Sequence, residues 1–128
     1  MIGSSRTGKY LISGILASFM VARAVLYLSP DSDFYVVGYN IHHLFSGMLV
    51  AIICLLPLLI IRPKGRTGVV LAFFSGTGLG LMLDEWVYLI VTDGSNASYL
   101  LPVSFWGGLA MIVACVAYIW ILVRLAHR

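Results

Sequence analysis

The stretch Val69–Val91, VVLAFFSGTGLGLMLDEWVYLIV, decides the fold of this chain because it is a long apolar run that carries two adjacent acids near its end. A helix that spans a bilayer needs about 20 largely apolar residues, and this run is long enough. Strands of a membrane β-barrel are excluded, since they take only about 10 residues each. We therefore predict a transmembrane helix that holds Asp84 and Glu85 inside the membrane.

Three further apolar runs have the same character, and together the four runs predict transmembrane helices at about 10–28, 37–61, 69–91 and 101–125. Turn-forming residues separate them, as in Arg62-Pro63-Lys64-Gly65-Arg66. The fold class predicted from this pattern is all-α, a polytopic membrane protein with four transmembrane helices in a bundle. Residues 1–128 are expected to form a single transmembrane domain.

The composition agrees with a membrane protein and indicates its orientation. Of the 128 residues, 61% are hydrophobic and only 10% are charged, whereas a soluble domain carries roughly 25% charged residues. The loops on one side of the predicted bundle hold Arg6, Lys9, Arg62, Lys64, Arg66, Arg124 and Arg128, and those on the other hold Asp31, Asp33 and Asp93. The positive-inside rule then predicts cytoplasmic N and C termini. The net charge of +3 indicates anionic lipid headgroups as the partner of the basic side, with no nucleic acid.

The first span has a second interpretation. A basic start, an apolar stretch and the tripeptide Ala22-Arg23-Ala24 imitate a secretory signal peptide with its cleavage site. We expect the segment to be retained as a helix, since the chain still includes Met1.

Three charged residues and two histidines lie well inside the predicted spans, namely Arg23, Asp84, Glu85, His42 and His43. Each charge near a helix centre costs at least about 2.5 kcal/mol on insertion scales. With about 1.5 Å of rise per residue, Arg23 and His42 lie roughly 7 Å inside their outer helix ends and Asp84 roughly 10 Å inside. All five are therefore expected at one depth in the outer leaflet, where they form a polar site.

Imidazoles and carboxylates are ligands that suit zinc, iron or manganese. We predict that a divalent transition metal is bound by His42, His43, Asp84 and Glu85. Supporting or substrate-binding roles are expected for Arg23, Tyr39, Asn40 and Tyr88. Because adjacent residues on a helix point about 100° apart, we expect one histidine and one acid to face the bundle interior. The other two would face a second cavity or the interface of a homo-oligomer or partner membrane subunit.

Small residues recur at the same depth on three of the predicted helices. Gly76, Gly80 and Asp84 are spaced by four residues, so they share one helix face. Such faces allow neighbouring backbones to approach closely. The residues predicted to serve helix packing are Gly47, Gly76, Gly80, Gly107 and Gly108.

Two segments of the sequence resemble a pattern found in other membrane proteins. The segment 41–47, IHHLFSG, followed by 78–86, GLGLMLDEW, resembles a group of small four-helix prokaryotic integral membrane proteins that share a His-His-x-x-x-Gly and a Gly-x-Gly-x-x-x-Asp-Glu pattern. The likeness covers two spans, about half of the chain, and implies that the two pairs of residues belong together in a prokaryotic cytoplasmic membrane. The histidines and acids also distantly resemble those of zinc-dependent ceramidase-like membrane hydrolases, whose further spaced histidines are missing here.

Three functions are open at this stage. The first is a metal-binding site that faces the outer side and acts on a lipid or lipid-soluble substrate, as a hydrolase or a redox enzyme. The second is a component of a proton or ion pathway, although the inner half of the bundle offers few polar side chains. The third is a structural or accessory subunit of a larger membrane complex, in which the polar residues hold helices together.

Overall fold

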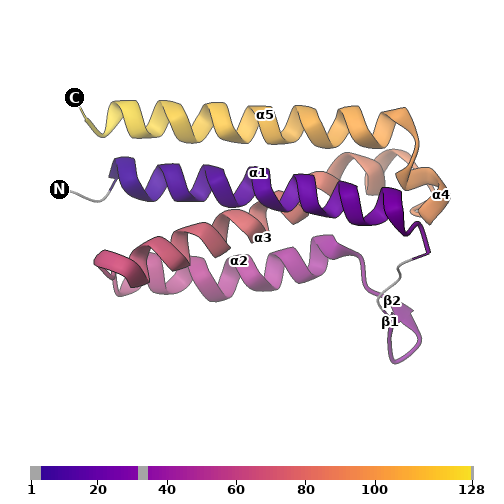
Figure 1. The fold of residues 1–128 in the computed structure, drawn as a ribbon, viewed down its shortest axis with the longest axis horizontal. Coiled ribbons are helices and arrows are strands. Elements are labelled where there is room, and N and C mark those ends of the chain that lie inside the picture. The colour runs from indigo at the N-terminus through magenta and orange to yellow at the C-terminus, as the bar shows by residue number, and fades with distance from the viewer. Residues whose placement is uncertain (1–3, 32–34, 128) are drawn as a thin grey trace.

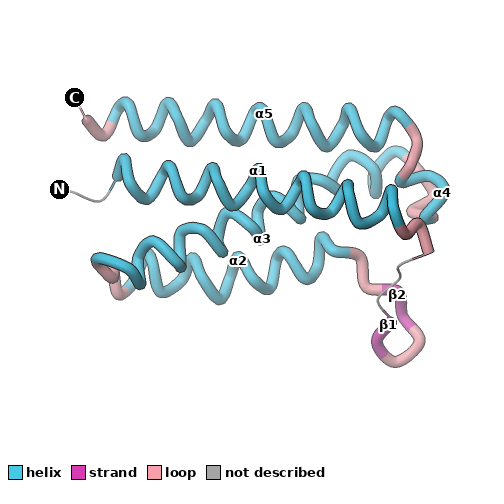
Figure 2. Tube along the Cα trace, in the orientation of Figure 1, coloured by secondary structure: helices cyan, strands magenta, loops and turns pink. Residues whose placement is uncertain are grey.

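Four long helices run side by side in the computed structural model, which describes residues 4–31 and 35–127 (Figures 1 and 2). They are α1 (Ser4–Leu28), α2 (His43–Ile60), α3 (Gly65–Val91) and α5 (Pro102–Leu125). Each is long and apolar enough to cross a membrane. The predicted all-α four-helix fold of a membrane protein is therefore confirmed, while Asp33 and Arg128, two of the charges used above, lie outside the described residues.

The connections divide the bundle into two chemically different ends. Both termini and the link from α2 to α3 lie at one end, which we call the terminal end (Figure 1). The other end, the hairpin end, holds strands β1 (Tyr35–Val36) and β2 (Tyr39–Asn40) and the short helix α4 (Asn96–Tyr99). The basic residues that flank the spans are therefore gathered at the terminal end, and its placement in the cytoplasm stays a prediction.

The predicted second span is wrong at its start, because α2 begins at His43 and not at residue 37. Strands β1 and β2 precede it as an antiparallel hairpin that pairs Val36 with Tyr39. The two residues between the strands, Val37 and Gly38, have φ angles of 52° and 83°. Positive φ at both central positions is the backbone of a tight hairpin turn. The apolar side chains around Gly38 concealed this turn in the sequence pattern.

Helix α3 is the central helix, since it packs against α1, α2 and α5. Its contact with α2 is a backbone contact: a Cβ atom at Gly47 would lie 2.6 Å from the carbonyl oxygen of Gly78, and one at Gly78 would lie 2.6 Å from the backbone nitrogen of Ala51. Its contact with α5 places Gly107 against the side chain of Val87. Glycine at these positions lets the helices approach to a distance that any side chain would prevent.

The contact of α3 with α1 uses two other glycines of α3, Gly76 and Gly80. Gly76 faces the backbone of Leu11, and a Cβ atom at Gly80 would lie 2.6 Å from the carbonyl oxygen of Ile15. Beyond this contact, a buried apolar cluster joins α1 to α5 and consists of Ile15, Phe19, Ile112 and Ile119. Close packing on three sides holds α3 firmly, so the positions of Asp84 and Glu85 are fixed by the whole bundle.

We expect Gly78→Val to destabilise the protein by about 1–3 kcal/mol, because the new side chain would overpack a backbone contact. The matched control is Ala117→Val, which adds two methyl groups at an exposed position on α5 and is expected to change the free energy of unfolding little. Denaturant unfolding in detergent measures both. Equal stability of the two variants would contradict the packing described here.

Candidate functional site

The polar residues meet at the hairpin end, around an ion pair between α1 and α3. Arg23 is 4% exposed and Asp84 is fully buried. The Nε atom of Arg23 donates to Oδ1 of Asp84 at 2.7 Å. Gly108 on α5 leaves room for this pair, since a Cβ atom there would lie 2.9 Å from Asp84 Oδ1 and 3.0 Å from Arg23 Nη2.

The guanidinium of Arg23 has five N–H donors, and the structure gives it five hydrogen bonds. Besides the bond to Oδ1, Nη2 donates to the carbonyl oxygens of Ser104 at 2.9 Å and Asp84 at 3.4 Å. Nη1 donates to Ser104 Oγ at 3.2 Å and to the carbonyl oxygen of Tyr99 at 3.3 Å. The guanidinium carbon also lies 4.1 Å from the centre of the Tyr99 ring. Arg23 therefore ties α1 to α3, α4 and α5 at once.

The second carboxylate oxygen of Asp84 faces the cavity side of the cluster. Oδ2 accepts a hydrogen bond from the hydroxyl of Tyr99 and lies 2.9 Å from Nε2 of His43. Burial, and next the charge of Asp84, raise the pKa of the Tyr99 phenol far above its ordinary value, so Tyr99 stays a donor. The ring nitrogen Nε2 of His43 donates when it carries the proton, since the buried carboxylate can only accept.

Glu85 joins α3 to the start of α2. Its Oε2 atom accepts from the backbone N–H of Leu44 at 2.7 Å, one of the N-terminal donors that an α-helix cannot satisfy internally. The helix-capping residue His42 makes no capping bond with its own side chain. The carboxylate of Glu85 thus caps α2 from the neighbouring helix, where the helix dipole favours a negative charge.

The other oxygen of Glu85 lies between two imidazoles. Oε1 is 3.2 Å from Nδ1 of His42 and 3.3 Å from Nδ1 of His43. The two histidine side chains are about one fifth exposed, whereas that of Glu85 is 4% exposed. The imidazoles therefore form the accessible side of this group and the carboxylate its inner side.

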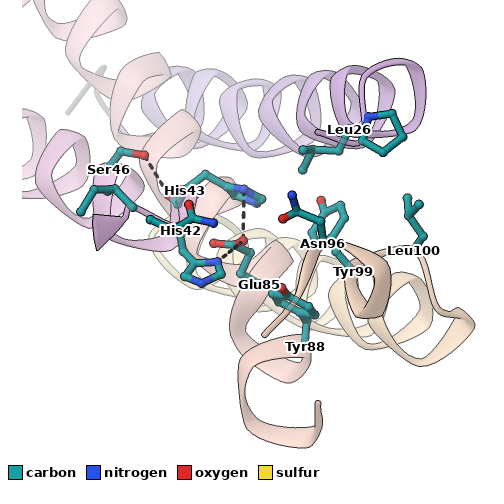
Figure 3. A pocket seen from close by; sticks show the side chains of 12 residues that line it. Leu26, His42, His43, Ser46, Glu85, Tyr88, Asn96, Tyr99 and Leu100 are labelled. Carbon is teal, nitrogen blue, oxygen red and sulfur yellow. Dashed lines mark hydrogen bonds and ion pairs between the residues drawn. The ribbon is translucent and has the colours of Figure 1, made fainter. Parts of the chain in front are cut away.

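A cavity of about 160 Å³ opens beside the imidazoles, and we call it the hairpin-end cavity. In Figure 3 the side chains of His42, His43 and Glu85 converge at its wall, with Tyr88 and Asn96 nearby. Its lining residues come from the end of α1, the hairpin, α2, α3 and α4: Leu26, Pro30, Asn40, Ile41, His42, His43, Ser46, Glu85, Tyr88, Asn96, Tyr99 and Leu100. The wall is mixed in character: α2, α3 and α4 contribute polar groups, and Leu26 of α1 and Leu100 after α4 contribute apolar ones.

A small turn before α4 positions Tyr99 in this site. Oδ1 of Asp93 accepts from the backbone N–H of Ser95 at 3.0 Å and from the hydroxyl of Ser98 at 2.5 Å. Ser95 in turn caps α4 by accepting from the N–H of Ser98. The bond from Ser98 and then those from Ser95 lower the pKa of Asp93 to about 2. The charged form of Asp93 therefore stabilises α4, the helix that carries Tyr99.

The structure places the predicted site residues in two groups. His42, His43 and Glu85 line the cavity, together with Asn40 and Tyr88. Arg23 and Asp84 are buried behind them. Tyr39 does not join the site, because it lies in the hairpin and is 74% exposed.

The expectation that only one histidine and one acid face inward is wrong. Both pairs meet, because α2 begins beside α3: the capping residue His42 reaches Glu85, and the first helical residue His43 reaches Asp84. Across the part of the chain that the structure describes, no three or more His, Cys, Asp or Glu side chains are already arranged to hold a metal ion. Asp84 in particular is occupied by Arg23, Tyr99 and His43.

Sequence reasoning missed Tyr99 and Ser104, which both bind the Arg23–Asp84 pair. Ser104 carries a weak signal, since it lies near the outer end of the fourth apolar run at about the depth of Arg23. Tyr99 carries none, because its position depends on the turn that forms α4.

Protein-family models, curated proteins and solved structures were compared with the chain, and none of them matches it.

We expect Asp84→Asn to destabilise the protein by about 3–5 kcal/mol, because it leaves a buried guanidinium without its counter-charge. Ser104→Ala removes one side-chain acceptor of the same guanidinium and is expected to cost about 1 kcal/mol. Denaturant unfolding in detergent compares the two. If Asp84→Asn lowers the free energy of unfolding by less than Ser104→Ala does, the ion pair does not hold the bundle together.

The order of α4 is expected to depend on the charge of Asp93. The folded pKa of about 2 lies below the ordinary value of 3.8, so the stabilisation is present at pH values above 3.8 and is lost as the pH falls through about 2. Hydrogen exchange at the amides of Ser95 and Ser98 follows this loss. In Asp93→Asn the exchange should be fast already at neutral pH, and unchanged protection in that variant would contradict the role of Asp93.

Proposed function

We propose that the hairpin-end cavity binds a divalent transition-metal ion through His42, His43 and Glu85. The observation that carries the proposal is the placing of Oε1 of Glu85 at 3.2 Å and 3.3 Å from the two Nδ1 atoms. Two ligands of one zinc ion are separated by about 3.0–3.5 Å when each bond is about 2.0–2.2 Å long. Zinc, iron and manganese all accept imidazole and carboxylate ligands.

Binding in this proposal replaces existing contacts instead of filling a finished cage. The three side chains are paired with one another, and an ion that enters from the cavity takes over those pairs. The imidazoles are the accessible members of the group, so they are the side chains with room to turn toward the ion. Displacement of protons by the metal makes the affinity fall at acidic pH.

Asp84 has a different role from the predicted one in this proposal. A histidine that binds a metal almost always donates its second ring N–H to a carboxylate or a carbonyl group. The 2.9 Å contact from Nε2 of His43 to Oδ2 of Asp84 provides that partner, and it leaves Nδ1 for the ion. Asp84 therefore acts as the carboxylate that orients His43, while Arg23 and Tyr99 keep Asp84 in place.

The balance of charge supports a cation at this site. Arg23 offsets the charge of Asp84, and the other described lysines and arginines lie at the terminal end, in α1, α3, α5 or the link from α2 to α3. Among the described residues, Glu85 is faced by the N-terminus of α2 and by the two imidazoles. A cation from outside the chain completes the electrostatics of a carboxylate that is 3% exposed.

The residues that line the cavity support one class of molecule for the ion to act on. Its polar wall lies beside apolar side chains of Leu26 and Leu100, at the end of helices that cross the membrane. We propose an amphiphilic substrate, a lipid or lipid-soluble molecule whose polar group reaches the ion while its apolar part stays in the bilayer.

Elemental analysis and calorimetric titration with Zn²⁺ or Mn²⁺, on protein purified in detergent without chelator, test the proposal. We expect about one ion per chain. Glu85→Gln is the sharpest variant, because its amide oxygen can still accept from the N–H of Leu44 while the ligand charge is lost. We expect it to weaken binding by at least about 10-fold, and His43→Ala to do the same.

The matched controls remove a histidine or an acid elsewhere. His127→Ala and Asp31→Asn lie outside the group of His42, His43 and Glu85, and we expect both to bind like the unchanged protein. Absence of stoichiometric metal would overturn the proposal. Equal loss of affinity in the control variants would also do so, since binding would then be spread over the surface.

A structural role is favoured for the buried pair by a separate observation. The five hydrogen bonds of Arg23 reach α3, α4 and α5, so removing the pair should affect the fold before any ligand. Such a role does not account for the two imidazoles and Glu85, which border a cavity. If the whole cluster were only structural, Glu85→Gln would change stability and no ligand affinity.

A further inference from the structure

A second cavity, of about 380 Å³, lies at the terminal end between the first turns of α1 and the last turns of α5. We call it the terminal groove. The residues of its wall that matter here are Gly8, Lys9, Ile12, Trp120, Arg124 and His127. The start of α1 and the end of α5 lie at the opposite end of the bundle from β1, β2 and α4 (Figure 1), and the groove shares no lining residue with the hairpin-end cavity.

The base of the terminal groove is apolar. Gly8 is buried against α5, and a Cβ atom there would meet the side chain of Val123. Ile12 and Trp120 continue this apolar surface toward the middle of the bundle. An apolar base formed by two neighbouring helices suits a hydrocarbon chain.

The rim of the groove is basic. Lys9 and Arg124 are exposed, and the guanidinium carbon of Arg124 lies 4.9 Å from the centre of the Trp120 ring. A cation–π contact of this length holds the charge over one wall of the groove. His127 adds an imidazole to the same rim.

The two cations have no carboxylate opposite them within the described residues. The four ion pairs found there all lie in the hairpin-end cluster. The five acidic residues of the sequence belong to the α1–α2 connection, to the second half of α3 and to the turn that follows it. An anion from outside the chain is therefore the partner that fits Lys9 and Arg124.

We propose that the terminal groove binds an anionic phospholipid. Its phosphate lies between Lys9 and Arg124, and one acyl chain follows Ile12 and Trp120. From Lys9 to Leu28, α1 rises about 28 Å, close to the thickness of about 30 Å of a bilayer's hydrocarbon core, so Lys9 stands at headgroup level. Basic pockets between membrane helices bind anionic headgroups, and tryptophan favours the same interface.

The test uses the full chain, delipidated in detergent and then mixed with phosphatidylglycerol or phosphatidylcholine of matched acyl chains. Native mass spectrometry counts the retained lipid. We expect preferential retention of phosphatidylglycerol, and a loss of roughly 25-fold in its affinity for the double variant Lys9→Gln/Arg124→Gln, about five-fold for each cation.

The matched control is Arg62→Gln/Lys64→Gln, which removes the same charge at the same end outside the groove. It is expected to keep the preference. Equal retention of the two lipids overturns the proposal, as does an equal loss in the control, which shows nonspecific surface charge. Glycerol phosphate is titrated as the free headgroup. If it displaces the lipid at equal concentration, the phospholipid proposal is overturned in favour of a soluble anion.

Discussion

The buried ion pair of Arg23 and Asp84 is the interaction on which the hairpin end depends. A guanidinium and a carboxylate leave water only at a large cost, which is repaid only when the geometry is good and the remaining donors are satisfied. The five bonds of Arg23 meet that condition. They require an acceptor on α4 and α5 as well as on α3, so the pair determines where Tyr99 and Ser104 lie. The glycine at 108 follows from the same requirement, because a side chain there would displace the pair.

Adjacent acids on one helix serve two different purposes in this arrangement. Asp84 points into the bundle and is held by groups from α1, α2 and α4, whereas Glu85 points toward the start of α2 and caps it. The angle of about 100° between neighbouring side chains therefore separates a buried half of the cluster from a half that borders the cavity. His43 connects the halves, since one ring nitrogen faces each acid. A change at Asp84 is thereby transmitted to the cavity through the orientation of one imidazole.

The fold was predictable from the sequence because four apolar runs of membrane length leave little choice. The meeting of Arg23 with Asp84 was also within reach, since both lie at one depth. The hairpin was not, because its turn depends on positive φ at Val37 as well as at Gly38, and apolar residues around it extend the hydropathy signal of α2. The convergence of the histidines on the acids required that α2 begin only at His43, whereas the apolar run predicts a helix that is continuous from residue 37. The role of Tyr99 depends on a turn held by Asp93, a tertiary arrangement with no periodic signal.

The middle of the bundle separates the two ends chemically. Among the described residues of that region, Ser18 donates to the carbonyl oxygen of Ile15 and Thr77 to that of Phe73, each within its own helix. Ser75 is the one buried side chain there whose polar atom has no hydrogen-bond partner. Two of these hydroxyls bond within their own helices and the third has no partner, so they do not form a chain along which a proton can move from helix to helix. In the proposed function, the hairpin-end cluster therefore exchanges its ion and protons at its own end of the bundle.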